Sequence, residues 1–357
     1  MSLEGNSIVN SDGSNTVDKC NRVLNGALEN ASQDLSYNDH IGKDDNLKFL
    51  CSSSEIILKD LEHSFYNHDM KCEFLLLRYL TENEKHKQKL IKFINPTINK
   101  LNRYSNVIPY EYNAVPVSPS IKQFDINNYI NASFISGAFG TKIIAAQNPM
   151  ENTLNSFWLM IINHKISLII LLSYTFEESN DKYIQYWPKE TNTPITIVDP
   201  SNKDKTFTIK LTSQMEIIEK YVVMRTIDIL EGENVILTLR HYHVNFWEEH
   251  SVPLQQIGFQ VIEDLISQMA EEYEKTKNPL LVHCPDGIGR TGTFLALFNI
   301  VRCLQEEKKA KIEVPFYNVF NVVRKIREER FGMVTDSNQY KYIYDFCKQW
   351  INRFYEI

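Results

Sequence analysis

One segment in the C-terminal third of the chain constrains the fold most. The apolar run Leu280–Val282 leads into Cys284, and a loop with two glycines then leads to Arg290 and a helix-forming stretch. In this order the loop follows the C-terminal end of a strand and leads to a helix N-terminus, which is typical of α/β domains. The segment therefore predicts an α/β fold with a ligand site at this loop.

The same loop has the composition of an anion-binding site with a nucleophile at its base. Glycines allow backbone N–H groups to converge on one point, and the helix that follows directs its positive end there. Arg290 can bind two oxygens of a tetrahedral oxyanion, and the positive field is expected to keep Cys284 a thiolate. A thiolate beneath a bound phosphate can attack phosphorus in line, and Thr291 can hydrogen-bond the sulfur. The alternative interpretations are a small buried cysteine and an ordinary glycine turn.

Composition limits what else the chain can be. The 357 residues are 43% hydrophobic and 23% charged, which is typical of a globular chain that buries a core without staples. The net charge of −7 argues against nucleic-acid binding, and the longest apolar run, Leu168–Leu172, is too short to span a membrane. The six cysteines include no CxxC pair. We therefore expect no zinc site, no disulfide framework and a cytoplasmic protein.

The predicted organisation is a tail followed by one domain. Residues 1–50 are rich in Asn, Ser, Asp and Gly, so we expect a flexible N-terminal tail, with one domain over 58–355. The apolar pattern predicts helices over 56–80, 155–165, 258–277, 291–307, 319–331 and 341–355. It predicts strands over 127–135, 141–147, 167–173, 206–214, 216–230, 234–246 and 278–284.

The run from His283 through Cys284 and five further residues to Arg290 and Thr291 resembles the HC-x5-R-[S/T] signature of the cysteine-dependent protein tyrosine phosphatases. The resemblance extends over about residues 60–352. It implies the family fold, a highly twisted mixed β-sheet flanked by helices. It also implies hydrolysis of phosphotyrosine through a phosphocysteine intermediate, without a metal or cofactor.

Further family landmarks occur in the order that the family has them. Tyr104 resembles the tyrosine that stacks on the substrate ring and sets the depth of the pocket. Glu177 stands where the family has an acidic residue that orients the signature arginine; an ordinary exposed charge is the other interpretation. In the run 241–253, Glu249 stands where a mobile loop carries the acid that protonates the leaving phenolate, and the histidines are expected to be packed strand residues. Gln339 matches the second of two glutamines that position the hydrolytic water.

The resemblance assigns roles to two groups of residues. The implied catalytic residues are Cys284, Arg290, Glu249, Thr291 and Gln339. The implied substrate-binding residues are Tyr104, Asn106, Asp286, Gly287, Ile288, Gly289 and Glu177.

Five positions in this set or beside it depart from the family pattern. Glu249 replaces Asp and adds one methylene, and Thr335 replaces the first water-positioning glutamine. Pro285 lacks an N–H group and so removes one donor, while Asp286 brings a carboxylate to a site that binds a dianion. Asn106 replaces an Asp and accepts hydrogen bonds without charge assistance. The nucleophile and the arginine are in place, so these changes bear on the efficiency of catalysis.

Two interpretations follow. One is an active phosphatase. The other is a pseudophosphatase that binds phosphotyrosine proteins, because a misplaced acid and a lost glutamine impair turnover more than binding. In both, the partners are phosphotyrosine-containing proteins, and we expect a monomer. The high Asn, Lys and Ile content is typical of an AT-rich gene, and the chain resembles the divergent single-domain phosphatases of polydnaviruses. That resemblance implies a location in the cytoplasm of a host cell.

Overall fold

The computed structural model describes residues 70–85, 96–121, 126–174, 184–200, 202–218, 221–253, 255–313 and 315–355. The predicted tail over 1–50, the first part of the helix predicted over 56–80, and Glu177 lie outside these residues.

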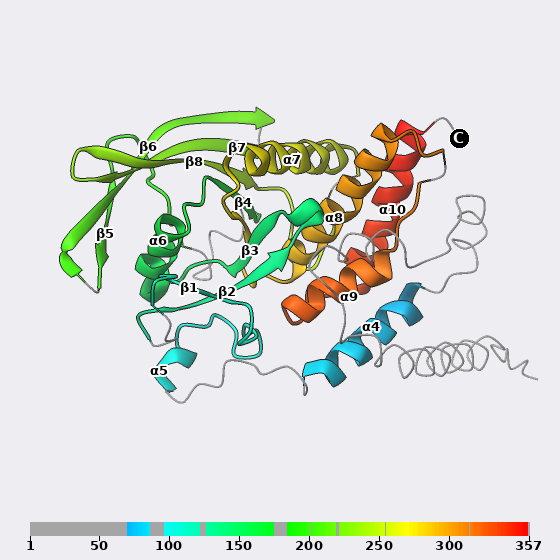
Figure 1. Cartoon of the computed structure of the whole chain (residues 1–357), viewed down its shortest axis with the longest axis horizontal. Helices are drawn as coiled ribbons and strands as arrows, with labels where there is room; N and C mark the ends of the chain where they lie inside the picture. The colour runs from blue at the N-terminus through cyan, green and yellow to red at the C-terminus, as the bar shows by residue number, and fades with distance from the viewer. Residues whose placement is uncertain are drawn as a thin grey trace, which may run out of the picture.

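One twisted sheet runs through the middle of the described part of the chain (Figure 1). Its nine strands lie in the order β1-β2-β3-β9-β4-β8-β7-β6-β5. Their bounds are β1 Ala114–Pro116, β2 Tyr129–Ser136, β3 Lys142–Gln147, β4 Leu168–Leu172, β5 Ile195–Asp199, β6 Asn202–Ile218, β7 Val222–Glu231, β8 Asn234–Val244 and β9 Leu280–Cys284. The central strands β3, β9, β4 and β8 are parallel, and the other neighbouring pairs are antiparallel. The predicted mixed sheet is confirmed.

Helices cover both faces of this sheet (Figure 1). The longer helices are α4 Met70–Lys85, α6 Leu154–Asn163, α7 Gln255–Thr276, α8 Gly289–Lys309, α9 Val319–Glu329 and α10 Ser337–Phe354. Short segments are α5 Pro96–Asn99, η1 Ala138–Gly140 and η2 Glu151–Thr153.

Successive side chains of the central strands face opposite sides of the sheet, so they belong to two apolar layers. On β9, Leu280, Val282 and Cys284 face the layer that contains α4, α7, α8, α9 and α10, whereas Leu281 faces the layer that contains α6. Successive strand side chains point to opposite faces, so a strand covered on both sides is a continuous apolar run. This is why β4 is an unbroken apolar segment in the sequence and β9 is apolar over Leu280–Val282.

Most predicted helices and strands are present, with shifted ends, but one predicted strand is wrong. The run 216–230 forms parts of two strands, because β6 ends at Ile218 and β7 begins at Val222, and these two residues are antiparallel partners. The run contains neither Gly nor Pro, so nothing in its residue types marks the turn. The short strands β1 and β5 were not predicted. No helix among the described residues is long and apolar enough to cross a membrane.

Candidate active site

Strand β9 carries the predicted nucleophile to the middle of the sheet. Cys284 is its last residue, and Gln147 on the neighbouring strand β3 is its register partner. The Cys284 side chain is only 1% exposed. The chain then turns into α8, which begins at Gly289. The turn therefore joins the C-terminal edge of the sheet to a helix N-terminus, as the sequence predicts.

Backbone contacts fix this turn, residues 285–289, which we call the cradle loop. Gly287 adopts φ +69, and a Cβ built on it would lie 2.3 Å from the carbonyl oxygen of Ala146. The loop thus packs against the backbone of β3 with no room for a side chain. The N–H of Asn148 donates to the carbonyl oxygens of Cys284 and Pro285, over 3.0 and 3.1 Å. The position of the loop is set by its neighbours as well as by its own sequence.

Arg330 holds the outer side of the cradle loop. This buried guanidinium donates through Nε to the carbonyl oxygen of Gly287 (2.9 Å) and through Nη2 to that of Asp286 (3.2 Å). Nη2 also donates to Oδ1 of Asn131 on β2 (2.8 Å). In a planar trans peptide the N–H points opposite to the C=O. Because the two carbonyls face Arg330, the N–H groups of Gly287 and Ile288 face the interior of the loop.

Sequence reasoning missed Arg330, although a signal was present. Val319, Val322 and Ile326 recur at helical spacing, and Arg330 follows Ile326 by four residues. It therefore falls in register with the buried face of α9. A charged residue in such a register indicates a buried ion with dedicated partners, because charged groups are almost never buried unless paired.

The carboxylate of Asp286 lies inside the cradle loop. Its Oδ1 accepts hydrogen bonds from the N–H groups of Ile288 (2.9 Å) and Gly289 (3.2 Å). The same oxygen lies 3.0 Å from Sγ of Cys284, which donates to it. From the other side, the hydroxyl of Thr291 donates to the same sulfur over 3.1 Å. The loop that was predicted to bind an external anion thus holds one of its own.

This arrangement changes the protonation state expected for the nucleophile. Burial, together with the charge of Asp286, raises the pKa of Cys284 to about 12, against the lowering effect of Arg290 and Thr291. The prediction that the positive field keeps Cys284 a thiolate is wrong for this state of the protein. The physical reasons are the burial of the sulfur, which has the larger effect, and the negative charge that Asp286 brings to it.

Arg290 connects the cradle loop to the loop after β8. Its side chain is 2% exposed, and Nη1 donates to the carbonyl oxygen of Trp247 over 2.6 Å. Trp247 is fully buried, and its indole N–H donates to the carbonyl oxygen of Ser251 over 3.0 Å. These contacts hold the segment that carries Glu249 against the signature arginine.

Tyr104 is coupled electrostatically to Glu249 and to the cradle loop. The pKa of Tyr104 is raised by burial first, then by the negative charges of Glu249 and Asp286, with a smaller contribution from Cys284. Electrostatic effects of this kind decay with distance, so the groups that exert them lie close to the Tyr104 phenol. Tyr104 is half-buried, and Asn106, two residues further on, is exposed. The structure therefore brings together the predicted nucleophile, acid and ring-stacking residue.

Gln339 and Thr335 border the cradle loop at Gly289. A Cβ built on Gly289 would lie 3.0 Å from Oγ1 of Thr335 and 3.4 Å from Nε2 of Gln339. The preceding residue, Val334, has φ +62, which is unusual for a β-branched side chain. Its N–H donates to the carbonyl oxygen of Ile288 (3.0 Å), and its own carbonyl accepts from Nη2 of Arg327 (2.6 Å). These bonds hold the strained backbone that directs Thr335 at the cradle.

Three buried histidines lie on the central strands. The Tyr186 hydroxyl contacts Nε2 of His283 (2.7 Å) and Nε2 of His241 (2.8 Å), so its oxygen links the two rings. Nε2 of His243 contacts the hydroxyl of Ser173 (2.7 Å). The two β8 histidines are packed strand residues, as the sequence predicts.

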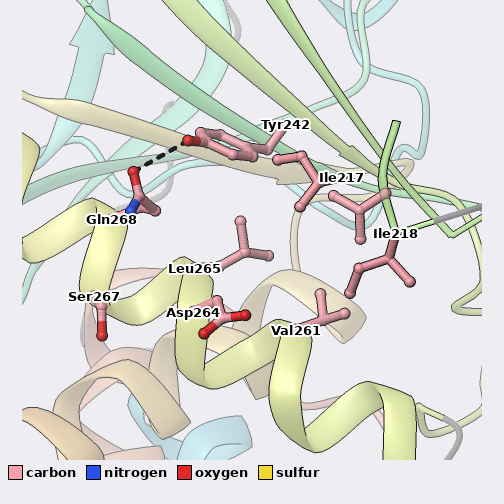
Figure 2. Close-up of a pocket in the computed structure, with 9 residues that line it drawn as sticks. Ile217, Ile218, Tyr242, Val261, Asp264, Leu265, Ser267 and Gln268 are labelled. Carbon is pink, nitrogen blue, oxygen red and sulfur yellow. Dashed lines mark hydrogen bonds between the residues drawn. The ribbon is translucent and has the colours of Figure 1, made fainter. Parts of the chain in front are cut away.

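A separate pocket of about 290 Å³ lies between the end of β6 and α7 (Figure 2). Ile217 lies across it from Val261 and Leu265, and the Tyr242 hydroxyl at its edge donates to Oε1 of Gln268 over 3.2 Å. Its lining residues include none of the cradle loop or of the loop after β8. This pocket is therefore not part of the candidate active site.

Comparison with protein families gives one match over most of the chain. The family model described as protein-tyrosine phosphatase matches residues 98–349. Human tyrosine-protein phosphatase non-receptor type 12 is 32% identical over 246 residues, which is 69% of this chain and 29% of that protein. Rat receptor-type tyrosine-protein phosphatase epsilon is 32% identical over 262 residues, 72% of this chain and 35% of that protein. The chain thus spans about a third of the length of these curated relatives.

Solved structures show the same fold. The catalytic domain of human protein tyrosine phosphatase non-receptor type 18 superposes with a TM-score of 0.66 at 22% identity, over 80% of this chain and 98% of that one. A structure of the same phosphatase in complex with HER2 phosphopeptides gives a TM-score of 0.65, over 82% and 97% of the two chains.

Proposed function

The chain belongs to the protein-tyrosine phosphatase family, and we propose that it hydrolyses phosphotyrosine in proteins through a phosphocysteine intermediate. One observation supports this most. A buried thiol, a buried guanidinium and the amides of a helix N-terminus converge at the end of the central strand β9: Cys284, Arg290, Ile288 and Gly289. A phosphoryl group bound to those donors lies above the sulfur that would attack it.

In the first step, the Cys284 thiolate attacks the phosphorus of the substrate. The Sγ–P bond forms while the bond between phosphorus and the tyrosine oxygen breaks, and Glu249 gives its proton to the departing phenolate. Arg290 and the cradle amides hold the phosphoryl oxygens. Because attack requires the thiolate, the proton that the thiol donates to Asp286 must first pass to solvent water.

In the second step, water attacks the phosphocysteine. The Sγ–P bond breaks, the water oxygen becomes part of the released phosphate, and the Glu249 carboxylate accepts the proton that the water loses. Thr291, whose hydroxyl donates to Sγ, stabilises the sulfur as it leaves. Gln339, beside Gly289, is proposed to orient the water.

Substrate choice is proposed to rest on Tyr104, Asn106 and Glu177. Tyr104 would stack on the substrate ring, so that the depth of the site favours phosphotyrosine over the shorter phosphoserine. Asn106 would accept a hydrogen bond from the substrate backbone. Glu177, which lies outside the described residues, keeps its proposed role of orienting Arg290.

The second candidate function is a pseudophosphatase that binds phosphotyrosine proteins without turning them over. The contacts of Asp286 favour it, because a thiol that donates to a carboxylate is not the attacking form. Thr335 at the position of a water-positioning glutamine favours it as well.

We also propose a reducing, cytoplasmic location, phosphotyrosine-containing proteins as partners, and a monomer. The location is supported by Cys284, Cys303 and Cys347, which are free thiols in the described part of the chain. A nucleophilic cysteine functions only while it stays reduced.

The test is phosphate release from a phosphotyrosyl peptide, with a chelator present, for wild type and Cys284→Ser. Turnover in wild type that disappears in the variant supports the phosphatase. Peptide binding by both proteins without turnover by either supports the pseudophosphatase. Neither binding nor turnover would overturn both functions.

A further inference from the structure

The cradle amides are occupied in the free protein, and the occupant is a residue of the cradle itself. One oxygen of Asp286 takes the N–H of Ile288, the N–H of Gly289 and the thiol proton of Cys284. These are donors that a phosphoryl group must contact to sit above the sulfur. A carboxylate and a phosphate dianion cannot share them, because both accept the same hydrogen bonds and both are negatively charged.

We propose that Asp286 is a positioning residue that closes the phosphate site: its carboxylate substitutes for phosphate on the cradle amides, holds Cys284 as a thiol, and must leave before substrate binds. This inference rests on the proposed site for phosphate, whether that site serves turnover or binding alone. The Asp286 side chain thus both fills the phosphate site and keeps the Cys284 thiol protonated.

The geometry allows the side chain to leave. Asp286 is only partly buried, whereas Cys284, Gly287, Ile288 and Gly289 around it are buried. Its backbone stays in place during such a movement, because Arg330 binds its carbonyl oxygen (3.2 Å) and that of Gly287 (2.9 Å). Rotation of the side chain toward solvent would therefore open the site without unfolding the loop.

The charged groups around the site determine whether Cys284 is favoured as a thiol or as a thiolate. Two cations act on the sulfur: Arg290, from the first turn of α8, lowers the pKa of Cys284, and Cys284 in turn raises that of Arg330. Asp286 in the cradle loop opposes them by raising the pKa of Cys284, and Asp286 and Glu249, on the loop after β8, both raise the pKa of Tyr104. Removing the Asp286 charge leaves Arg290 and Arg330 as the charges that act on the sulfur, while burial continues to raise the pKa of Cys284. The pKa of Cys284 should then fall, because an opposite charge favours the thiolate and a like charge no longer opposes it.

The experiment uses two measurements on the full chain that do not require turnover. Binding of inorganic phosphate is measured by calorimetry, and the rate of Cys284 alkylation by iodoacetamide is followed against pH by mass spectrometry of the peptide that contains it. Cys284→Ser shows which alkylated peptide is the right one. The variants are Asp286→Ala, Asp286→Asn and Asp286→Ser, with Asp228→Ala, a carboxylate on β7, as the matched control.

We expect Asp286→Ala to bind phosphate about tenfold more tightly or better, and its alkylation midpoint to move down by about one pH unit or more. Asp286→Asn keeps an oxygen for the amides but lacks the charge. It should therefore lower the alkylation midpoint while improving phosphate affinity less than Asp286→Ala does. Asp228→Ala should change neither value.

Asp286 also satisfies amides at the start of α8, so Asp286→Ser takes the place of Asp286→Ala if the alanine variant does not fold. Asp286→Ser retains a hydroxyl oxygen for those amides without the charge, and it should show the same downward shift of the midpoint.

Unchanged phosphate affinity and an unchanged midpoint in the folded Asp286 variants would overturn the inference. If wild type turns over and the variants show no change, the inference fails while the phosphatase stands. If the variants change as expected and no protein turns over, the phosphatase fails while the inference stands.

Discussion

The backbone N–H and the hydroxyl of Thr335 donate to the same atom, Oε1 of Gln339, over 3.0 and 3.1 Å. A backbone N–H can only donate, so this contact fixes which end of the Gln339 amide is the oxygen. The NH₂ end then faces Gly289 in the cradle. Gln339 therefore presents a donor to the phosphate site, and the acceptor that a hydrolytic water needs must come from elsewhere.

Thr335→Val should slow the breakdown of the phosphocysteine. The change keeps the shape of the side chain but removes one of two anchors of Gln339, and it should lower the free energy of unfolding by about 1 kcal/mol. Rapid-quench kinetics should then show a larger initial burst of phenol followed by a slower steady state. Thr335→Ser retains the hydroxyl and is the matched control. Equal steady-state rates in the two variants would show that the hydroxyl has no such role.

Glu249→Gln should lower kcat on a phosphotyrosyl peptide by about 10²–10⁴-fold, because it removes the proton donor for the leaving phenolate. An aryl phosphate with an acidic phenol departs without a proton, so its hydrolysis should fall much less. Glu248→Gln makes the same change at the exposed neighbouring residue and should affect neither substrate. A loss of equal size on both substrates would rule out Glu249 as the acid.

The buried histidines should make the protein less stable as the pH falls. Burial lowers the pKa of His243 and His283 to about 3, from the usual 6.5, and that of His241 well below its usual value. Below pH 6.5 the unfolded chain binds protons that the folded chain does not. The stabilisation is therefore complete above pH 6.5 and is lost toward pH 3, by up to about 1.4 kcal/mol per pH unit for each histidine.

Urea unfolding at pH values between 4 and 7, about one pH unit apart, measures the slope of the unfolding free energy against pH. His243→Gln should reduce the slope by the contribution of one histidine. It should also lower the stability at neutral pH, because the hydrogen bond to Ser173 is changed. The same slope in wild type and variant would contradict the assignment of His243 as a neutral buried ring.

Gly287→Ala and Gly140→Ala test whether the cradle loop depends on its close approach to β3. Both glycines have positive φ, +69 and +71, but a Cβ on Gly140 meets nothing within 4 Å, whereas one on Gly287 lies 2.3 Å from Ala146. Gly140→Ala should cost about 1–2 kcal/mol for its backbone conformation alone. Gly287→Ala should cost about 1–3 kcal/mol more, and it should abolish phosphate binding because the loop must shift. Urea unfolding and calorimetry give both values, and equal costs would argue against the close approach.

Arg330→Met should destabilise the protein by about 3–5 kcal/mol, because it leaves the carbonyls of Gly287 and Asp286 and the Asn131 side chain without their buried donor. Arg330→Lys keeps the charge but cannot serve acceptors on two segments, so it should recover only part of the loss. Arg353→Met, at a half-exposed arginine of α10, is the control. Full stability of Arg330→Lys would show that charge alone suffices.

The sequence predicted the central part of the fold because that part depends on local pattern. The apolar runs of β4 and of Leu280–Val282 in β9, and the helices α7 to α10, follow from which residues face the two apolar layers. The boundary between β6 and β7 depends instead on strand pairing, and no turn residue marks it. Strand β5 is short, and most of its side chains are not buried, so its pattern is weak.

The residues of the candidate site were predictable from the sequence, but whether the cradle is open or occupied by Asp286 was not. The motif identifies Cys284, Arg290 and Thr291 by their order along the chain. It does not say where the Asp286 side chain points, and that direction alone decides whether the cradle is open. Arg330 was missed for a related reason, because its partners are carbonyl groups of the cradle loop and the side-chain oxygen of Asn131 on β2, far away in the sequence.

The contact between Cys284 and Asp286 also bears on oxidation. Peroxide reacts with thiolates, and a protonated, buried thiol resists conversion to sulfenic acid. A phosphatase whose nucleophile rests as a thiolate is vulnerable whenever its site is empty. In this protein the sulfur keeps its proton while the site is empty, because the thiol donates to Asp286 over 3.0 Å. The free protein should therefore survive oxidative conditions that inactivate a resting thiolate, and the same side chain that delays phosphate would preserve the nucleophile until phosphate arrives.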